Sequence, residues 1–153
     1  MSGELGTSPL LAIAGGPGLR INGEKVYLRP LGHADANDRY HAWLNDDELN
    51  RYSERRGTSY SHDDILAYLD DANTSPALLQ QGVFMIEDNN HVGNISLRVT
   101  NVGARVAEVA TLVGEKDYWG RGVIVDAGKA LIHFAFQNLK LRKVTLGNYA
   151  INR

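Results

Sequence analysis

Apolar residues recur in five short segments that predict β-strands. In residues 25–31, Val26 and Leu28 alternate with polar neighbours until Pro30 ends the strand, because proline has no backbone N–H to donate. Turn-forming sequences at residues 88–90 and 100–105 separate the next three segments, which favours an antiparallel meander. The four remaining predicted strands are residues 83–87, 92–99, 106–113 and 143–150.

Three other segments repeat their apolar residues near the helical period of 3.6, and each predicts an α-helix. Asp35 is expected to cap the first, over residues 36–46, and Ser61 to form a capping box with Asp64 at the start of the second. The third and longest helix is predicted over residues 123–141. Their apolar faces are predicted to be Ala36, Tyr40, Trp43 and Leu44, then Ile65, Leu66 and Leu69, and finally Ala127, Leu131, Phe134, Ala135 and Leu139.

The order strand, helix, helix, three strands, helix, strand predicts an α+β fold. A mixed, mostly antiparallel sheet then carries helices on both faces, as a three-layer α/β/α arrangement. The connection from residue 113 through the long helix to residue 144 is expected to be a right-handed crossover between parallel strands. Residues 25–153 are predicted to form the domain. Residues 1–24 are predicted to be a flexible leader or arm, because the sequence GGPG at residues 15–18 breaks regular structure.

Composition narrows the function classes. The chain has 153 residues, 43% hydrophobic and 22% charged, which is ordinary for one globular domain. Its net charge of -2 gives no reason to expect nucleic-acid binding, and the absence of cysteine excludes disulfides and thiolate metal sites. The five histidines show no metal-ligand spacing, so no metal is expected. The leader has no basic region before its short apolar run, which predicts a cytoplasmic protein without a membrane anchor.

The junction before the long helix reads DYWGRGVIVDAG, residues 117–128, and it contains the candidate chemistry. A helix start offers free backbone N–H groups and a positive dipole end, which is the physical basis of a phosphate site. A tight turn at Gly120 and Gly122 is the alternative explanation. The P-loop spacing fails, because five residues separate Gly122 from Gly128, and the dinucleotide fingerprint fails, because Val125 occupies the third glycine position.

A different pattern fits this junction. Residues 114–122, GEKDYWGRG, resemble almost letter for letter a loop of the GNAT acyltransferase superfamily, in the branch of the ribosomal-protein N-acetyltransferases of RimJ/RimL type. The resemblance extends over residues 25–153. Its weaker parts are residues 28–46, residues 91–97, the HFAF sequence at residues 133–136 and Asn152.

The resemblance implies that the chain binds acetyl-CoA. In this family the strand before the loop is opened by a bulge, its backbone N–H groups bind the acyl carbonyl and pantetheine, and the loop binds the pyrophosphate. Ile124 departs from the family pattern, which has a small residue there to let backbone and pyrophosphate approach each other. The residues assigned to acetyl-CoA in this way are Thr111, Leu112, Val113, Trp119, Gly120, Arg121, Gly122, Val123, Ile124 and Asn152.

The implied reaction is transfer of an acetyl group to a primary amine, with Glu108 as the candidate base. A solvent-facing strand residue is the alternative role for Glu108, because alternation alone does not say which face it occupies. Arg51, Glu54 and Arg55, together with Arg56, are candidates for binding the acceptor, and a solvated charged loop is the alternative there. A non-catalytic acyl-CoA-binding or interaction module with the same fold is the second hypothesis for the whole chain.

The family supplies its general acid from a tyrosine on a helix after the last strand. That helix and the closing hairpin have no counterpart after Asn152, so we expect a domain that is incomplete at this end, with a reduced variant of the domain as the alternative. An uncovered last strand at residues 143–150 also predicts self-association through its edge.

Overall fold

The strands form one sheet, in which each strand lies beside the strand that precedes or follows it in the sequence. The computed structural model describes residues 18–46, 60–118 and 120–146. In this part of the chain six strands pair in the order β1-β2-β3-β4-β5-β6. All pairs are antiparallel except β5 and β6, which are parallel, so the predicted parallel pairing of these two strands is confirmed. The strands are β1 (Ile21–Asn22), β2 (Val26–Arg29), β3 (Leu78–Met85), β4 (His91–Asn101), β5 (Val106–Val113) and β6 (Lys143–Leu146).

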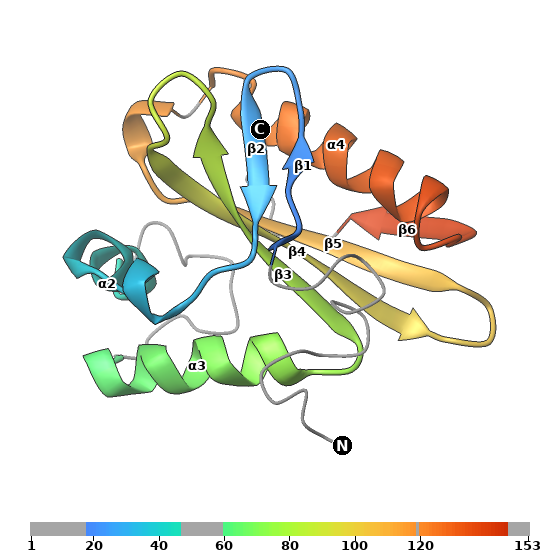
Figure 1. The fold of residues 1–153 in the computed structure, drawn as a ribbon, viewed down its shortest axis with the longest axis horizontal. Helices are drawn as coiled ribbons and strands as arrows, with labels where there is room; N and C mark the ends of the chain where they lie inside the picture. The colour runs from blue at the N-terminus through green and yellow to red at the C-terminus, as the bar shows by residue number, and fades with distance from the viewer. Residues whose placement is uncertain (1–17, 47–59, 119, 147–153) are drawn as a thin grey trace.

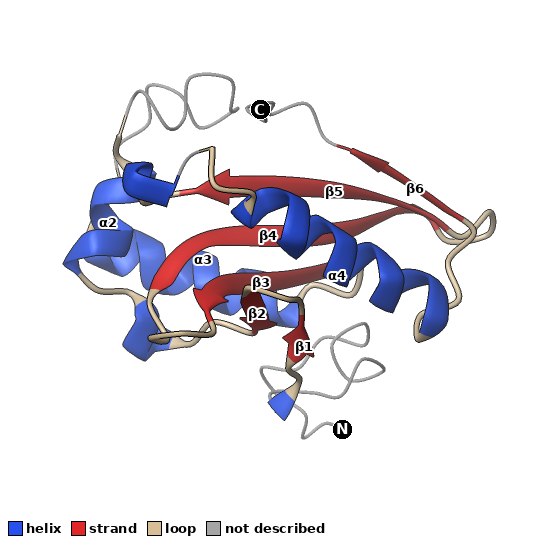
Figure 2. Cartoon of the chain, turned by 90° about the horizontal axis from the view of Figure 1, so that it is seen from above, coloured by secondary structure: helices blue, strands red, loops and turns tan. Residues whose placement is uncertain are grey.

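Helices cover both faces of the sheet (Figures 1 and 2). The long helix α4 (Val123–Gln137) packs on one face, where Val123, Ala127 and Leu131 join strand residues in the larger core cluster. Helices α2 (Asp38–Leu44) and α3 (His62–Thr74) cover the other face. The three-layer α+β fold predicted from the sequence is therefore confirmed.

The predicted cap of the second helix is confirmed, whereas that of the first is wrong. Ser61 accepts a hydrogen bond from the Asp64 N–H, and the Asp64 side chain accepts one from the Ser61 N–H. The cap of α2 is Asn37, which accepts a hydrogen bond from the Tyr40 N–H at 3.0 Å. Asp35 ends a short 3-10 helix, η2 (His33–Asp35), instead. Its carboxylate pairs with Arg29 at 2.9 Å, so it stabilises the end of β2 rather than the start of α2.

The domain begins before residue 25, because β1 pairs with β2 and Ile21 joins the core, so residues 21–22 are not part of a flexible leader. Two further boundaries differ from the prediction for reasons of tertiary structure. Strand β3 begins at Leu78 rather than at residue 83, because its polar residues Gln80 and Gln81 are buried and pair with β4. Helix α4 ends at Gln137 rather than at residue 141, and Lys140 then adopts a left-handed conformation with φ of 59° that turns the chain toward β6. Of the last predicted strand, residues 147–150 lie outside the described residues.

Candidate functional site

The loop between β5 and α4 contains two left-handed glycines. After β5 the chain forms a 3-10 turn, η3 (Lys116–Tyr118), and α4 then begins at Val123 with Gly122 as its N-cap. Gly120 has φ of 77° and Gly122 has φ of 78°, a conformation that other residues rarely adopt. The glycine pair is thus required by the turn itself, whatever the loop binds.

The start of α4 offers backbone donors. No side chain caps the helix at Gly122, and the first intrahelical hydrogen bond runs from the Asp126 N–H to the Gly122 carbonyl at 3.0 Å. The N–H groups of residues 123–125 therefore have no intrahelical acceptor, and the positive end of the helix dipole lies beside them. This arrangement can bind an anion such as a pyrophosphate.

Val123 and Ile124 have different surroundings. Val123 is 2% exposed and belongs to the core between α4 and the sheet, so its side chain packs the helix start and only its backbone N–H can face a ligand. Ile124 is only partly buried, at the second position of the helix. The crowding expected from the sequence thus concerns Ile124 alone.

The β1–β2 turn is attached to the first turn of α4 by Asp126. Its carboxylate accepts hydrogen bonds from the backbone N–H groups of Glu24 at 2.9 Å, Lys25 at 2.8 Å and Val26 at 3.0 Å. Partial burial acts to raise the pKa of Asp126, but these three hydrogen bonds and the charge of Lys25 outweigh it, so the pKa lies below its usual value. Asp126 therefore fixes a segment 100 residues earlier in the chain beside the candidate phosphate loop.

Lys25 extends from this turn to the loop. Its Nζ donates a hydrogen bond to the Arg121 carbonyl at 3.3 Å. The same Nζ lies 3.5 Å from the point where a Cβ would stand on Gly122. The guanidinium of Arg121 itself lies 4.7 Å above the ring of Tyr118. Two cationic side chains thus flank the glycine pair.

The first letters of the GEKDYWGRG motif have structural roles. A Cβ on Gly114 would stand 2.6 Å from Trp43 Cε3, so only glycine lets the indole of α2 lie against this backbone. The next residue, Glu115, accepts a hydrogen bond from Trp43 Nε1 at 2.8 Å, and Lys116 pairs with Asp46 at 3.1 Å. The motif therefore fixes the loop to α2 as well as to the sheet.

The end of β5 differs from the sequence expectation. Its register with β4 is continuous from Ala107 to Val113, so the bulge expected from the resemblance is not present on this side. Within the described residues, β6 pairs with β5 only from Val106 to Val109. The Gly114 N–H donates to a carbonyl of β4, and the backbone N–H groups along a strand point alternately to its two sides. The Thr111 N–H, three residues earlier, therefore points away from β4, toward the side of β6.

Glu108 lies nearer the hairpin end of β5. Ala107 and Val109 point into the α4 core, so by alternation the half-buried Glu108 belongs to the α2/α3 face, opposite Arg98 of β4. It is three residues from Thr111, or about 10 Å along the strand. The structure therefore places Glu108 on the same strand as the predicted acyl site but not directly beside it.

A buried polar pair near Leu112 was not predicted from the sequence. Asn94 pairs in register with Leu112, and its Oδ1 lies 3.0 Å from Nε2 of His91. The imidazole stacks on Phe84 at 4.6 Å between ring centroids and meets the edge of Trp43 at 4.8 Å. Polar residues within an apolar strand segment were the available signal, but alternation did not show that they would be buried.

His91 is expected to make the stability of the fold dependent on pH. Burial is the main cause that lowers its pKa below the usual value of 6.5, and the hydrogen bond to Asn94 opposes this only in part. The unfolded chain then binds more protons than the folded chain just below pH 6.5. We expect the free energy of unfolding to fall as the pH drops through this range, by at most about 1.4 kcal/mol per pH unit.

Urea unfolding between pH 7.5 and pH 5.5 measures this effect. His91→Phe is expected to flatten the pH dependence, and His133→Phe, at an exposed position on α4, controls for the loss of an imidazole. Identical pH profiles for wild type and His91→Phe would contradict the assignment.

The remaining predicted site residues lie outside the described residues. These are Arg51, Glu54, Arg55, Arg56, Trp119 and Asn152. In the part of the chain that the structure describes, no group of three or more histidine, aspartate or glutamate side chains could hold a metal ion. No helix among the described residues is long and apolar enough to cross a membrane.

Comparisons with known proteins agree with this geometry. The family model described as an acetyltransferase (GNAT) domain matches residues 25–153. No curated protein matches the chain. Many solved structures share the fold at low sequence identity, and three of them illustrate it.

The first is a GNAT-family acetyltransferase from Bacillus anthracis, with a TM-score of 0.72, 18% identity, and coverage of 84% of this chain and 72% of the other. The second is described as a putative ribosomal-protein-serine acetyltransferase from Vibrio cholerae, with a TM-score of 0.67, 17% identity, and coverage of 89% and 77%. The third is spermidine N-acetyltransferase from Vibrio cholerae in complex with CoA and spermine, with a TM-score of 0.68, 21% identity, and coverage of 80% and 70%. Since the family model covers most of the chain, the protein belongs to the GNAT acetyltransferase family.

Proposed function

We propose that the chain is an acetyl-CoA-dependent N-acetyltransferase. The observation that carries this proposal is the uncapped start of α4 directly after two left-handed glycines, in the loop that follows β5. In this proposal the pyrophosphate binds at the loop and the pantetheine runs along the end of β5. The acyl carbonyl then lies near the Thr111 N–H, which faces away from β4.

Acetyl transfer to an amine needs three things from the protein. The amine must lose a proton, the thioester carbonyl must be polarised, and the leaving thiolate must be protonated. A backbone N–H at Thr111 can donate to the developing oxyanion. Glu108 is the proposed base, and its distance along the strand means that it acts through a water molecule or on an amine bound at that end.

The proposed acceptor is a primary amine. One neighbour in fold binds spermine together with CoA, and another is described as a ribosomal-protein-serine acetyltransferase. Together with the GEKDYWGRG motif, these neighbours support the RimJ/RimL-like branch, whose acceptors include both polyamines and protein N-termini. Arg51, Glu54 and Arg55 remain the proposed acceptor-binding residues.

Calorimetric titration with acetyl-CoA, followed by an assay of CoA release, tests the proposal. Spermidine and a peptide with a free N-terminal serine are suitable acceptors. We expect micromolar binding and amine-dependent CoA release. Binding without release for any amine supports the non-catalytic module, and absence of binding contradicts both functions.

Ile124 is expected to limit the affinity for acetyl-CoA. Replacing Ile124 by glycine removes a β-branched side chain from the first turn, and we expect about tenfold tighter binding, which corresponds to about 1.4 kcal/mol. The glycine is expected to reduce stability by up to about 1 kcal/mol. Val125→Gly is the matched control, because Val125 is the next residue of the same turn and is 58% exposed. Equal or weaker binding by Ile124→Gly would show that this side chain does not crowd the ligand.

A further inference from the structure

Lys25 lies at the phosphate loop although it is almost 100 residues distant in sequence. It belongs to the turn between β1 and β2, which Figure 1 shows next to the start of α4. The Asp126 carboxylate accepts the backbone N–H of Lys25 at 2.8 Å and those of both neighbours. Gly23 permits this contact, because a Cβ there would stand 2.6 Å from Asp126 Oδ2. The main chain of Lys25 is therefore held in one place.

The side chain of Lys25 then reaches the centre of the glycine pair. Its ammonium bonds to the carbonyl of Arg121, the residue between Gly120 and Gly122. An ammonium has three N–H donors, and this contact uses one of them. Lys25 is exposed, so the other two donors can reach a ligand at the same loop.

Electrostatics also favours a cation here. A pyrophosphate bound at the start of α4 would lie near the carboxylate of Asp126, and like charges at this distance repel each other. The Lys25 ammonium is close enough to Asp126 to help lower its pKa. It therefore offsets the one negative charge in the first turn of the helix.

We propose that Lys25 is a pyrophosphate-binding residue of the acyl-CoA site, held in position by Asp126. This inference rests on the proposed function. It adds a residue from the N-terminal hairpin to a site that the sequence resemblance assigned to residues 111–124 and Asn152.

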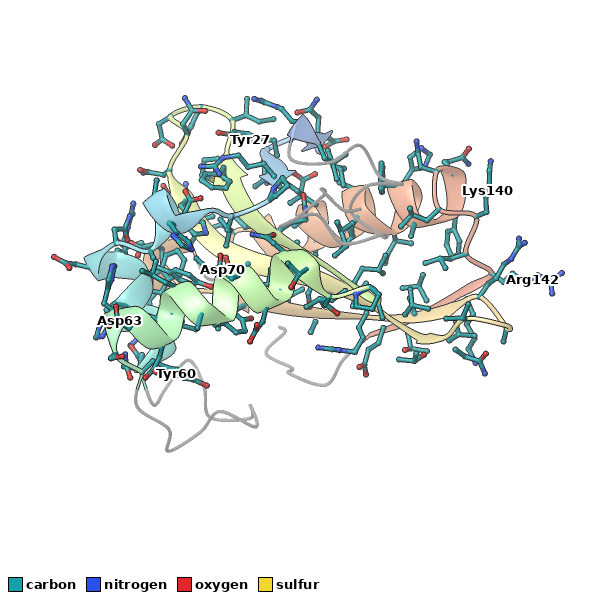
Figure 3. All side chains as sticks on the ribbon, turned by 60° about the horizontal axis from the view of Figure 1, so that its bottom comes forward. Tyr27, Tyr60, Asp63, Asp70, Lys140 and Arg142 are labelled. Atoms are coloured by element: carbon teal, nitrogen blue, oxygen red, sulfur yellow. The ribbon has the colours of Figure 1, made fainter. Side chains whose placement is uncertain are left out.

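Three ligands and two variants test the assignment by calorimetry. Lys25→Met removes the charge at similar side-chain length, and Lys140→Met removes the same charge at the opposite end of α4 (Figure 3). We expect Lys25→Met to bind acetyl-CoA about tenfold more weakly, since hydrogen bonds to a charged phosphate are strong. Lys140→Met is expected to bind it like wild type.

The three ligands differ in their phosphate groups, so they show which phosphate Lys25 contacts. Acetyl-dephospho-CoA lacks the 3′-phosphate and should show the same tenfold loss in Lys25→Met. Acetyl-pantetheine lacks all phosphates and should bind wild type and variant equally. Loss of the effect with acetyl-dephospho-CoA would assign Lys25 to the 3′-phosphate and overturn the inference. Equal weakening with acetyl-pantetheine would show a purely structural role and also overturn it.

Kinetics and the wild-type titration complete the test. Asp126→Asn is expected to raise the KM for acetyl-CoA while leaving kcat and the KM for the amine unchanged, as a positioning residue should. An unchanged KM for acetyl-CoA would contradict the role of Asp126. If Lys25→Met binds acetyl-CoA as tightly as wild type, the inference fails and the proposed function stands. If wild type itself does not bind acetyl-CoA, both fail.

Discussion

Gly114→Ala is expected to destabilise the protein by about 3 kcal/mol, because overpacking a rigid contact costs this much. The three atoms nearest to the added Cβ all belong to the indole of Trp43, and the nearest are too close for any real side chain. The ring is not free to move, since its Nε1 bonds to Glu115 and its edge packs on His91. In thermal unfolding, the melting temperature should fall by about 10 °C for a chain of this size.

Gly128→Ala is the matched control for Gly114→Ala. A Cβ on Gly128 meets nothing within 4 Å, and alanine is favoured over glycine inside a helix by up to about 1 kcal/mol. The same chemical change is therefore expected to raise the melting temperature on α4 and to lower it at the loop. An unchanged melting temperature for Gly114→Ala would contradict the close packing of Trp43.

A double mutant shows whether the indole is responsible. Adding Trp43→Leu to Gly114→Ala removes the ring that the new methyl group meets. The two substitutions together should cost less than the sum of their separate effects. Additive effects would mean that the methyl group disturbs some other contact.

The sequence predicted the layers of the fold because apolar periodicity depends on which faces are buried. β5 was predicted with its observed bounds, since both its ends are marked by turn residues. The start of β3 was missed, because glutamines that look like loop residues become buried once β4 pairs with them. Apolar periodicity along the chain therefore failed to predict the start of a strand that depends on pairing with another strand.

The candidate site was predicted less completely than the fold. The loop was found through its glycines, which are required locally by positive φ. Asp126 lies in the first turn of α4, where a negative charge suits the helix dipole, but its hydrogen bonds join segments 100 residues apart, and a single sequence contains no signal for such a contact. The same holds for Lys25 and for the contact between Trp43 and Gly114.

Gly122→Val is expected to weaken acetyl-CoA binding at least about a hundredfold, corresponding to about 2.7 kcal/mol. Three effects act together at this position. A β-branched residue at φ of 78° is strained, which costs about 1–2 kcal/mol unless the loop changes conformation. The side chain also enters the space beside the Lys25 ammonium, whose Nζ would be 3.5 Å from the new Cβ. Crowding of the phosphate by the added methyl groups is the third.

Gly122→Asn separates strain from crowding in the same titration. Asparagine tolerates the left-handed conformation better than valine does, so the loop should keep its shape and the melting temperature should stay near that of wild type. If Gly122→Asn also loses most of its affinity, the space above Gly122 belongs to the ligand. If it binds like wild type while Gly122→Val does not, the glycine is needed for loop conformation alone. Wild-type affinity in both variants would mean that acetyl-CoA does not approach this backbone, and the loop would be only a turn between β5 and α4.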